Sequence, residues 1–250
     1  EEGVSHEPVE PRWEEYYQYL PLYRWWKRLQ RLLKVAAWSL LACGMLGVAF
    51  YLALLLPPLP EIQVHQTSLL YSAQGNVMAH LNPGGMERTL ISLDEVSPYV
   101  IQATLATEDR RFYRHFGLDF HRIAGAAWAD IKARGMVQGA STITQQLARN
   151  LYLSFDKTWE RKLREALLAL RIEAKWDKET ILQEYLNTIY YGESAYGIEA
   201  AAQTYFGKRA KELTLAEAAL LMGIPKNPTA YSPWNDFAAA KKRQGVVLAS

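Results

Sequence analysis

The sequence predicts a mainly α protein: a helical domain preceded by one transmembrane helix and a small β-hairpin linker. Three observations lead to this prediction. Val35 to Leu56 is a run of about twenty residues that contains no charged side chain. Apolar residues recur at helical spacing through most of the chain after Asp94. Between these two parts, Thr67 to Leu81 contains two short apolar arms around a Gln-Gly-Asn turn, a pattern typical of a hairpin.

Composition and charge narrow the class of protein. The chain has 250 residues, 50% hydrophobic and 22% charged, which is enough for one sizeable core or two small ones. A formal net charge of +2 argues against a general nucleic-acid binder. The single cysteine, Cys43, cannot form an internal disulfide. The chain starts without Met and stops inside a helical pattern, so we expect a longer natural protein, with a further domain after Ser250.

We expect residues 1–34 to form a cytoplasmic tail and residues 35–56 a transmembrane helix that ends before Pro57. The run is apolar on all sides and long enough to cross a hydrocarbon layer of ~30 Å. Basic residues lie before the run and few follow it closely, so the positive-inside rule predicts a cytoplasmic N-terminus and an extracytoplasmic domain. A cleaved signal peptide is the weaker interpretation, because the run is long and lacks an evident cleavage site.

The remaining elements follow in order. Residues 57–95 are expected to form the linker, with the hairpin at Thr67 to Leu81 lifting the next domain off the bilayer. Residues 96–250 are expected to form the helical domain. Within it, Thr214-x-x-Glu217 is the pattern of a capping box, which predicts a helix from Leu215 to Gly223 that Pro225 closes.

The stretch from Gln138 to Asn150 predicts a helix with Ser141 as its N-cap. Apolar residues recur every fourth position and should face a core. The opposite face offers hydroxyl, amide and guanidinium groups in place of the usual Lys and Glu, which suits a polar, anionic ligand. An unusual surface helix is the alternative. The apolar stripe consists of Ile143, Leu147 and Leu151, and the polar face of Thr142, Gln145, Gln146 and Arg149.

Two carboxylates are candidates for chemistry. A helix is predicted from Ser97 to Arg110, with Glu108 on the same stripe as Ile101 and Leu105. Burial would favour the protonated form of this carboxylate, which suits a general acid or base near neutral pH. The alternative is a glutamate paired with a neighbouring arginine, Arg110 or Arg111, at the end of the helix.

The second carboxylate is Glu165, in the cluster RKLRE at 161–165. A basic cluster with one acid suits a phosphate, with or without a divalent cation. The alternative is a surface ion pair with Arg161, worth a few tenths of a kcal/mol. This helix is predicted to bury a stripe that consists of Leu163, Leu167, Leu170 and Ala174.

The chain resembles the family 51 glycosyltransferases, the peptidoglycan glycosyltransferases of class A penicillin-binding proteins and of monofunctional transglycosylases. Residues 108–117, EDRRFYRHFG, resemble the E-D-x-x-F-x-x-H-x-G motif of that family. Residues 139–150, GASTITQQLARN, and 161–165 resemble its second and third motifs. Residues 181–192, ILQEYLNTIYYG, and then AEAALL at 216–221 with PKNP at 225–228 resemble two more blocks. The blocks occur in the order of the family.

The resemblance implies a lysozyme-like glycosyltransferase domain with a membrane-associated jaw. It would polymerise lipid II by inverting transfer onto a lipid-linked growing glycan, with release of undecaprenyl pyrophosphate. Glu108 would be the base for the acceptor hydroxyl, and Glu165 would act at the donor pyrophosphate. No organic cofactor is implied; a divalent cation, Mg²⁺ or Mn²⁺, near Glu165 is left open. The residues expected to line the substrate cleft are Asp109, Phe112, His115, Ser141, Thr142, Gln145, Gln146, Arg149, Asn150, Arg161, Lys162 and Lys226.

Two positions depart from the family pattern: residue 149 is Arg in place of Lys, and residue 183 is Gln in place of Glu. Arg keeps the charge at 149 but changes its geometry. A pyrophosphate leaves as a stable anion and needs neutralising charge, which Arg149, Arg161, Lys162 and Arg164 would supply. Other wall-synthesis proteins are candidate partners. A muramidase-like hydrolase and a non-catalytic scaffold remain the alternative functions.

Apolar residues around the second motif have two interpretations. They are expected to be ordinary core residues, and the alternative hypothesis is that some of them form a surface that touches lipid. The residues concerned are Trp128, Ile131, Met136, Val137, Tyr152 and Phe155.

Overall fold

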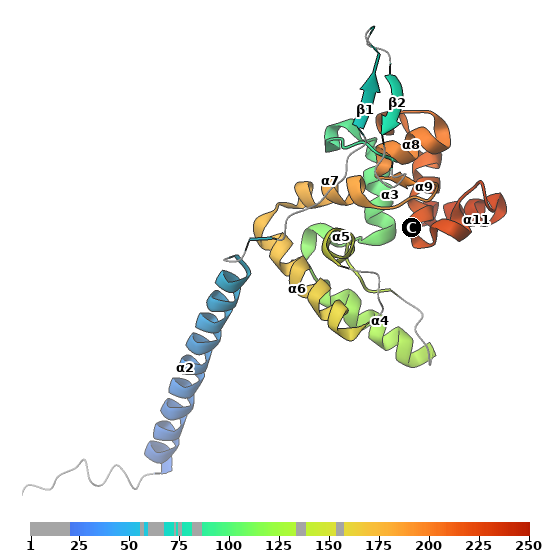
Figure 1. Cartoon of the computed structure of the whole chain (residues 1–250). Helices are drawn as coiled ribbons and strands as arrows, with labels where there is room; N and C mark the ends of the chain where they lie inside the picture. The colour runs from blue at the N-terminus through green and yellow to red at the C-terminus, as the bar shows by residue number, and fades with distance from the viewer. Residues whose placement is uncertain are drawn as a thin grey trace, which may run out of the picture. The chain divides into compact units, whose positions relative to one another are not determined.

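The computed structural model describes residues 21–55, 58–59, 68–72, 74, 77–81, 87–133, 139–153 and 158–250. The chain divides into two compact units, Glu1–Leu56 and Pro57–Ser250, and each is described by itself. The first unit contains helix α2, Pro21–Leu55, drawn in blue in Figure 1. The first twenty residues of the predicted tail lie outside the described part of the chain.

Helix α2 has 35 residues, and its most apolar window has a mean hydropathy of 2.0. At 1.5 Å per residue it is roughly 50 Å long, more than a hydrocarbon layer requires. By length and composition it is a candidate membrane span. It begins at Pro21 and not at Val35, so the last part of the predicted tail is helical. Proline suits a first helical turn, because its missing N–H would have no partner there.

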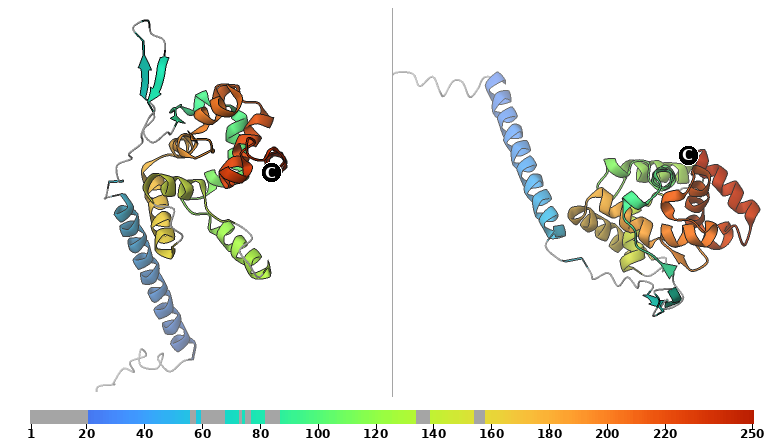
Figure 2. Two further views of the ribbon diagram at one scale, coloured as in Figure 1. Left: turned by 45° about the vertical axis from the view of Figure 1, so that its right-hand side comes forward. Right: turned by 90° about the horizontal axis from the view of Figure 1, so that it is seen from above.

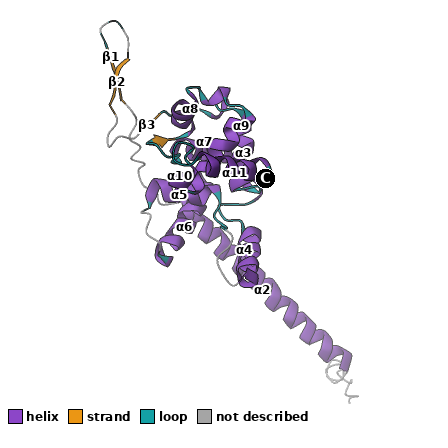
Figure 3. Cartoon of the chain, turned by 90° about the vertical axis from the view of Figure 1, so that its right-hand side faces the viewer, coloured by secondary structure: helices purple, strands orange, loops and turns teal. Residues whose placement is uncertain are grey.

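The predicted hairpin is confirmed at the start of the second unit. Strand β1, Ser68–Tyr71, pairs antiparallel with β2, Val77–Leu81, with a register irregularity after Leu70. Two further strands were not predicted: β3, Glu87–Arg88, pairs in parallel with β4, Ala195–Tyr196. Helices nevertheless dominate the described part of this unit, as Figure 3 shows in purple.

The predicted helical domain is confirmed. Its α-helices are α3 Pro98–Glu108, α4 Phe120–Ala133, α5 Ile143–Tyr152, α6 Trp159–Lys175, α7 Lys178–Thr188, α8 Ile198–Phe206, α9 Leu215–Gly223, α10 Pro228–Tyr231 and α11 Phe237–Leu248. Short 3-10 turns join them: η2 Leu93–Glu95, η3 Phe112–Arg114, η4 Ala210–Glu212 and η5 Ile224–Lys226.

Two helix clusters build one core. Helix α5 packs against α6 and α7, while α9 packs against α3 and α11. The two views of Figure 2 show the orange-to-red helices α9 and α11 beside the green α3. Fully buried side chains from both clusters fill the space between them, among them Ile143, Leu147, Ile181 and Leu221. The predicted apolar stripe of α5 is thus confirmed, with Leu151 partly buried against the core.

Side-chain hydrogen bonds cap the first turns of several helices. The predicted capping box of α9 is confirmed, because the Thr214 hydroxyl accepts from the Glu217 amide and the Glu217 carboxylate accepts from the Thr214 amide. For α5 the predicted N-cap, Ser141, is wrong by one residue: Thr142 is the cap, and Gln145 completes a capping box. Thr142 takes this position because Gln145, three residues later, can reach back to its amide.

One predicted helix face is incomplete and another is wrong. On α3 the predicted residues Ile101 and Leu105 are partly buried against the core, but the fully buried face consists of Val100, Ala103 and Thr104. Helix α6 buries Glu165, Ala169 and Ile172, while Leu163 and Leu167 are 64% and 42% exposed. The spacing of apolar residues predicts a stripe on α6, but it does not show which side of the helix packs against the core. The buried carboxylate is tolerated because two cations neutralise it.

Candidate active site

A polar cleft of about 540 Å³ lies where α3, α4, α5, η5 and α11 meet; we call it the main cleft. Four cationic side chains and a single carboxylate, that of Glu108, are among its described lining residues. Those lining residues are Thr107, Glu108, Arg122, Gly139, Ser141, Gln146, Arg149, Pro225, Lys226 and Arg243. The cleft therefore favours an anionic ligand beside one acid–base group.

A second hollow of about 380 Å³, the side hollow, adjoins the main cleft. The two share Thr107, Glu108 and Arg122. The side hollow adds further basic side chains, those of Arg110, Arg111 and His121. Glu108 therefore stands on a wall that borders both hollows and can meet ligands from either.

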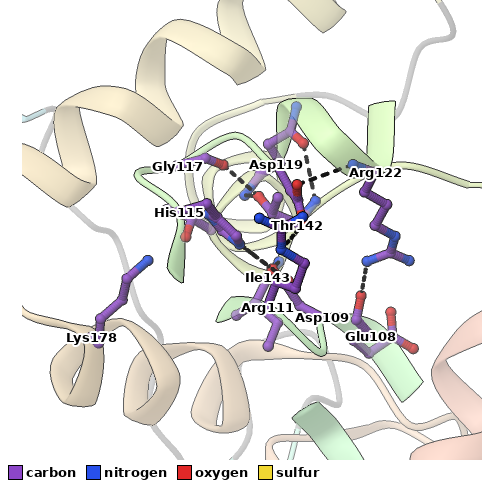
Figure 4. Close-up of polar contacts among 12 residues, drawn as sticks. Glu108, Asp109, Arg111, His115, Gly117, Asp119, Arg122, Thr142, Ile143 and Lys178 are labelled. Carbon is purple, nitrogen blue, oxygen red and sulfur yellow. Dashed lines mark hydrogen bonds and ion pairs between the residues drawn. The ribbon is translucent and has the colours of Figure 1, made fainter. Parts of the chain in front are cut away.

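Glu108 is the last residue of α3 and is half-buried. Its Oε2 accepts a hydrogen bond from Nε2 of Gln146 at 2.8 Å, and its backbone carbonyl accepts from the Arg122 guanidinium (Figure 4). The predicted alternative, a pair with a neighbouring arginine, is wrong. Arg110 donates to two backbone carbonyls instead, and Arg111 pairs with Asp119 at 3.6 Å. The Glu108 carboxylate is thus held from one side and open to the cleft.

Two buried tyrosines lie behind this pair. The Tyr185 hydroxyl donates to Oε1 of Gln146 at 3.4 Å, which orients the amide so that its nitrogen faces Glu108. Burial raises the pKa of Tyr185 and of Tyr191, and the nearby Glu108 carboxylate raises both further. Both phenols therefore stay protonated and act as neutral donors at physiological pH.

Asp109 fixes the wall behind Glu108. It is 1% exposed, accepts from Nε2 of His115 at 2.9 Å, and accepts from the backbone amide of Ile143 at 3.1 Å (Figure 4). One carboxylate thereby joins the end of α3, the loop after η3 and the first turn of α5. A carboxylate at a helix N-terminus is also favoured by the helix dipole. Asp109 borders the side hollow. Neither Asp109 nor His115 is among the described lining residues of the main cleft, so their role there is to hold the segments that carry its lining residues.

Thr142 and Gln145, predicted to bind the ligand, are buried and form the cap of α5. The Thr142 hydroxyl also donates to the Gly117 carbonyl at 2.6 Å. Gly117 has φ +69°, and a Cβ there would lie 3.1 Å from the backbone of Ala169, so only glycine fits. The structure therefore places these two side chains in the helix cap and not among the described lining residues of the main cleft.

Glu165 lies at the centre of an ion triad on α6. It is 1% exposed, and its two oxygens accept from Arg161, at 2.7 Å, and from Lys162. Nζ of Lys162 also donates to the Ser141 hydroxyl at 2.9 Å, and Ser141 lines the main cleft. The predicted pair with Arg161 exists, but it is not on the surface. Glu165 therefore reaches the cleft through Lys162, by holding that cation beside Ser141.

The residues around Glu165 do not fit a resident divalent cation. Both carboxylate oxygens already contact cationic groups, which repel a metal ion. The described part of the chain also has no group of three His, Cys, Asp or Glu side chains that could hold a metal. We derive no chemical step through a bound metal.

The other predicted site residues divide into two groups. Arg149 and Lys226 line the main cleft as expected. Phe112 does not: it is 1% exposed and packs in the core beneath Nζ of Lys178, 4.5 Å from the ring centroid. Asn150 is not among the described lining residues, and Arg164 pairs with Glu160 on the surface. Trp128 is 73% exposed, so its assignment to the core is wrong.

Sequence reasoning missed Thr107, Arg122, Gly139, Pro225 and Arg243 as lining residues, although two of them lie inside quoted motifs. Arg243 illustrates why. It comes from α11 and crosses α9 at Gly223, where a Cβ would lie 2.9 Å from Cγ of Arg243. Glycine therefore leaves the room that the arginine stem needs. This contact between two distant helices leaves no local signal in the sequence.

A half-buried carboxylate among arginines and lysines is an arrangement suited to enzymes that transfer a group to or from a phosphate-bearing ligand. The comparisons with known proteins give the family. Residues 74–250 match the model of the Transglycosylase family. The chain belongs to this family and contains its glycosyltransferase domain.

Similar proteins agree with that assignment. Penicillin-binding protein 2D of Bacillus subtilis is 48% identical over 222 residues, 89% of this chain and 32% of the relative. Penicillin-binding protein 1A of Aquifex aeolicus is 49% identical over 183 residues, 73% of this chain and 25% of the relative. The chain thus spans a quarter to a third of the length of these curated relatives.

A solved structure is also similar. The crystal structure of penicillin-binding protein 1A from Haemophilus influenzae matches 75% of this chain and 18% of its own, at 26% identity and a TM-score of 0.41. A score this low supports no argument about the fold, so the family assignment depends on the sequence matches.

Proposed function

We propose that this domain is a peptidoglycan glycosyltransferase that polymerises lipid II into glycan strands and releases undecaprenyl pyrophosphate. The observation that carries the proposal is the place of Glu108, on the wall that the main cleft and the side hollow share. A polymerase must bring two lipid-linked, phosphate-bearing sugars to one base. Two adjoining hollows with several basic side chains, which share the Glu108 carboxylate, meet that requirement.

In the proposed reaction Glu108 is the general base. It takes the proton of the acceptor sugar hydroxyl as that oxygen attacks the anomeric carbon of the donor sugar. The new carbon–oxygen bond forms opposite the bond to pyrophosphate, so the anomeric configuration inverts. The pyrophosphate leaves with the bonding electrons, and no acid is needed on that side because the leaving group is a stable anion. General base catalysis of this kind contributes about 10²–10⁴ in rate.

Arg149 and Lys162 are the proposed partners of the departing pyrophosphate. Arg149 lines the main cleft, and Lys162 is held beside Ser141 at its edge. Fixed positive charge in a cleft stabilises negative charge that develops as the bond breaks. Glu165 acts indirectly in this scheme, by fixing Lys162. The scheme assigns no divalent cation to Glu165, because Arg161 and Lys162 contact both of its carboxylate oxygens.

We also propose that α2 anchors the domain in the cell membrane, with the N-terminus cytoplasmic and the domain outside. Five basic residues in the first part of α2 precede its apolar run, which supports this orientation. The exposed apolar face of α6, formed by Trp159, Leu163 and Leu167, is a candidate contact with the bilayer surface. Trp128 on α4 is a second exposed ring of this kind.

The test is polymerisation of labelled lipid II by the full chain in detergent, compared with Glu108→Gln. We expect long, lysozyme-sensitive glycan from the parent and a loss of at least a hundredfold in the variant. Glu179→Gln, an exposed change on α7, is the matched control and should keep full activity. An inactive parent would contradict the proposal, release of small fragments from finished wall would favour a hydrolase, and an active Glu108→Gln would remove Glu108 as the base.

A further inference from the structure

A third hollow, of about 280 Å³, lies outside both regions described above; we call it the turn pocket. One wall is a tight turn at residues 192–195, and the other is the segment from Pro228 to Asn235. Its described lining residues are Tyr190, Gly192, Glu193, Ser194, Pro228, Thr229 and Asn235. The proposed reaction uses none of them.

The turn is strained. Glu193 and Ser194, its two central residues, have φ values of +49° and +61°, and they are the only non-glycine residues with positive φ in the described part of the chain. The amide of Ala195 donates to the Gly192 carbonyl at 2.8 Å, which closes the turn. Turns with two positive φ values strongly prefer Asn-Gly, so Glu-Ser is a costly choice. Strain of this kind concentrates at functional sites.

The surroundings hold the strained turn in place. The Ser232 hydroxyl, fully buried, donates to Oε1 of Glu193 at 2.8 Å. The Tyr205 hydroxyl donates to the Tyr191 carbonyl at 2.8 Å. Gly192 also packs against the far wall, because a Cβ there would lie 3.6 Å from the Pro228 carbonyl oxygen. The Glu193 carboxylate is thus presented at a fixed position.

An aromatic stack forms one end of the pocket. The ring of Tyr190 is 38% exposed and packs on Tyr196, with 4.7 Å between ring centroids. The Arg88 guanidinium covers the Tyr196 ring at 5.4 Å. The stack fixes Tyr190 as a part-exposed, rigid ring beside the Glu193 carboxylate.

The chemistry of these walls selects a ligand class. None of the described lining residues is cationic, and the Glu193 carboxylate would repel a phosphate. A carboxylate, hydroxyls and an amide instead offer acceptors and donors to a ligand rich in hydroxyl groups. A part-exposed tyrosine ring offers an apolar face for the C–H side of a sugar ring. The combination fits a neutral sugar.

The place of the pocket in the chain supplies the context. Pro225 and Lys226 line the main cleft, and Pro228 and Thr229 line the turn pocket. One short segment therefore borders both hollows. We propose that the turn pocket binds a sugar unit of the glycan strand outside the catalytic cleft, as a distal subsite that retains the growing polymer. This proposal rests on the proposed function for the identity of the strand, but its binding test does not.

The first test measures binding of chitotetraose, a neutral and lipid-free sugar oligomer, to the full chain in detergent by calorimetry. We expect saturable binding that Glu193→Gln weakens about tenfold, because a bond to a charged acceptor is lost while an acceptor for Ser232 remains. Tyr190→Ala should weaken binding and Tyr190→Phe should keep it. Glu108→Gln should bind as the parent does, because its change lies in the other site.

A second test separates a binding role from a structural one. Ser194→Gly removes strain at a positive φ, so it should raise the melting temperature by about 2–4 °C. If the strained turn serves binding, the same variant should weaken chitotetraose binding, because the carboxylate is held less rigidly. Higher stability with unchanged affinity would contradict the proposal. So would an absence of saturable binding.

Polymerisation then distinguishes this proposal from the function on which it rests. Glu193→Gln should make shorter strands from lipid II at an unchanged initial rate. Shortened strands at the parent rate support the distal subsite, and strands of parent length overturn it. If the parent binds chitotetraose but makes no polymer, the proposed function fails while the sugar site stands.

Discussion

The side-chain amide of Gln146 on α5 donates to the carboxylate of Glu108 at the end of α3, across 2.8 Å. This hydrogen bond joins the two helices that flank the main cleft and sets the direction in which the base faces. Tyr185, fully buried, fixes the other end of the same amide. The position of Glu108 therefore depends on a side chain from another motif.

Removal of that contact should slow the reaction without unfolding the domain. We expect Gln146→Ala to lower kcat by up to about a hundredfold, because small misplacement of a base has an effect of that size. Gln102→Ala, an exposed change on α3, is the matched control. Initial rates with lipid II and a melting curve for each variant test this. Equal rates for both variants would show that Gln146 does not orient the base.

The ion triad of α6 should contribute to stability. Glu165→Gln leaves Arg161 and Lys162 facing each other, so we expect the free energy of unfolding to fall by about 3 kcal/mol. This is the lower end of the usual loss for a broken buried pair, because both cations are partly solvated. Glu160→Gln breaks an exposed pair in the same helix and should change it by less than about 0.5 kcal/mol. Chemical denaturation compares them, and similar losses would contradict a buried triad.

The cap of α5 should matter more than an ordinary helix cap. Thr142→Ala removes the acceptor of the Gln145 amide and the donor to Gly117, so we expect a loss of about 1–2 kcal/mol in unfolding free energy. Thr142→Ser should recover most of it. Thr158→Ala removes the exposed cap of α6 and should cost less. Chemical denaturation measures the unfolding free energy of each variant. A smaller loss for Thr142→Ala than for Thr158→Ala would contradict the prediction.

Two glutamates should give opposite pH dependence. Burial raises the pKa of Glu184, so its ionised form costs stability near neutral pH and the cost disappears as pH falls below the pKa of the unfolded chain. Hydrogen bonds and charge from Lys208, with the Thr214 amide, lower the pKa of Glu217, so its stabilisation is present near neutral pH and is lost as pH falls through the folded pKa.

The corresponding variants test those signs. Glu184→Gln should raise the melting temperature at pH 7, and Glu217→Gln should lower it. Both differences should shrink toward pH 4, where the parent carboxyls become protonated in the unfolded chain. Melting curves between pH 4 and pH 8 check this. Differences that do not change with pH would show that neither effect comes from ionisation.

The exposed face of α6 should strengthen membrane contact. We expect Trp159→Asp and Leu163→Asp together to weaken binding of a form without residues 1–56 to lipid vesicles, because charge replaces apolar area at the surface. Lys175→Asp, exposed near the other end of α6, is a control for charge alone. Vesicle sedimentation measures the bound fraction of each form. Equal binding by all forms would show that this face of α6 does not contact the membrane.

The sequence by itself determined the helices, the hairpin, the apolar run of α2 and the family of the domain. These features depend on local patterns, namely periodicity, capping residues and motif spacing, which tertiary packing did not override. Motif spacing also found Glu108, Gln146, Arg149 and Lys226, because each lies in a cleft-forming segment that its motif defines.

Only the tertiary structure decided which face of each helix is buried and which distant groups meet. Leu163 faces outward and Glu165 inward, because the neighbouring helices supply the core that accepts this face and Arg161 and Lys162, on α6 itself, neutralise the buried carboxylate. The Thr142 hydroxyl caps α5 through a local bond, but only the tertiary structure brings it to the Gly117 carbonyl, which is distant in sequence. Arg243 lines the main cleft because its side chain packs over Gly223 of α9, where a larger residue would block it. These outcomes depend on contacts between elements far apart in the chain, which no local pattern specifies.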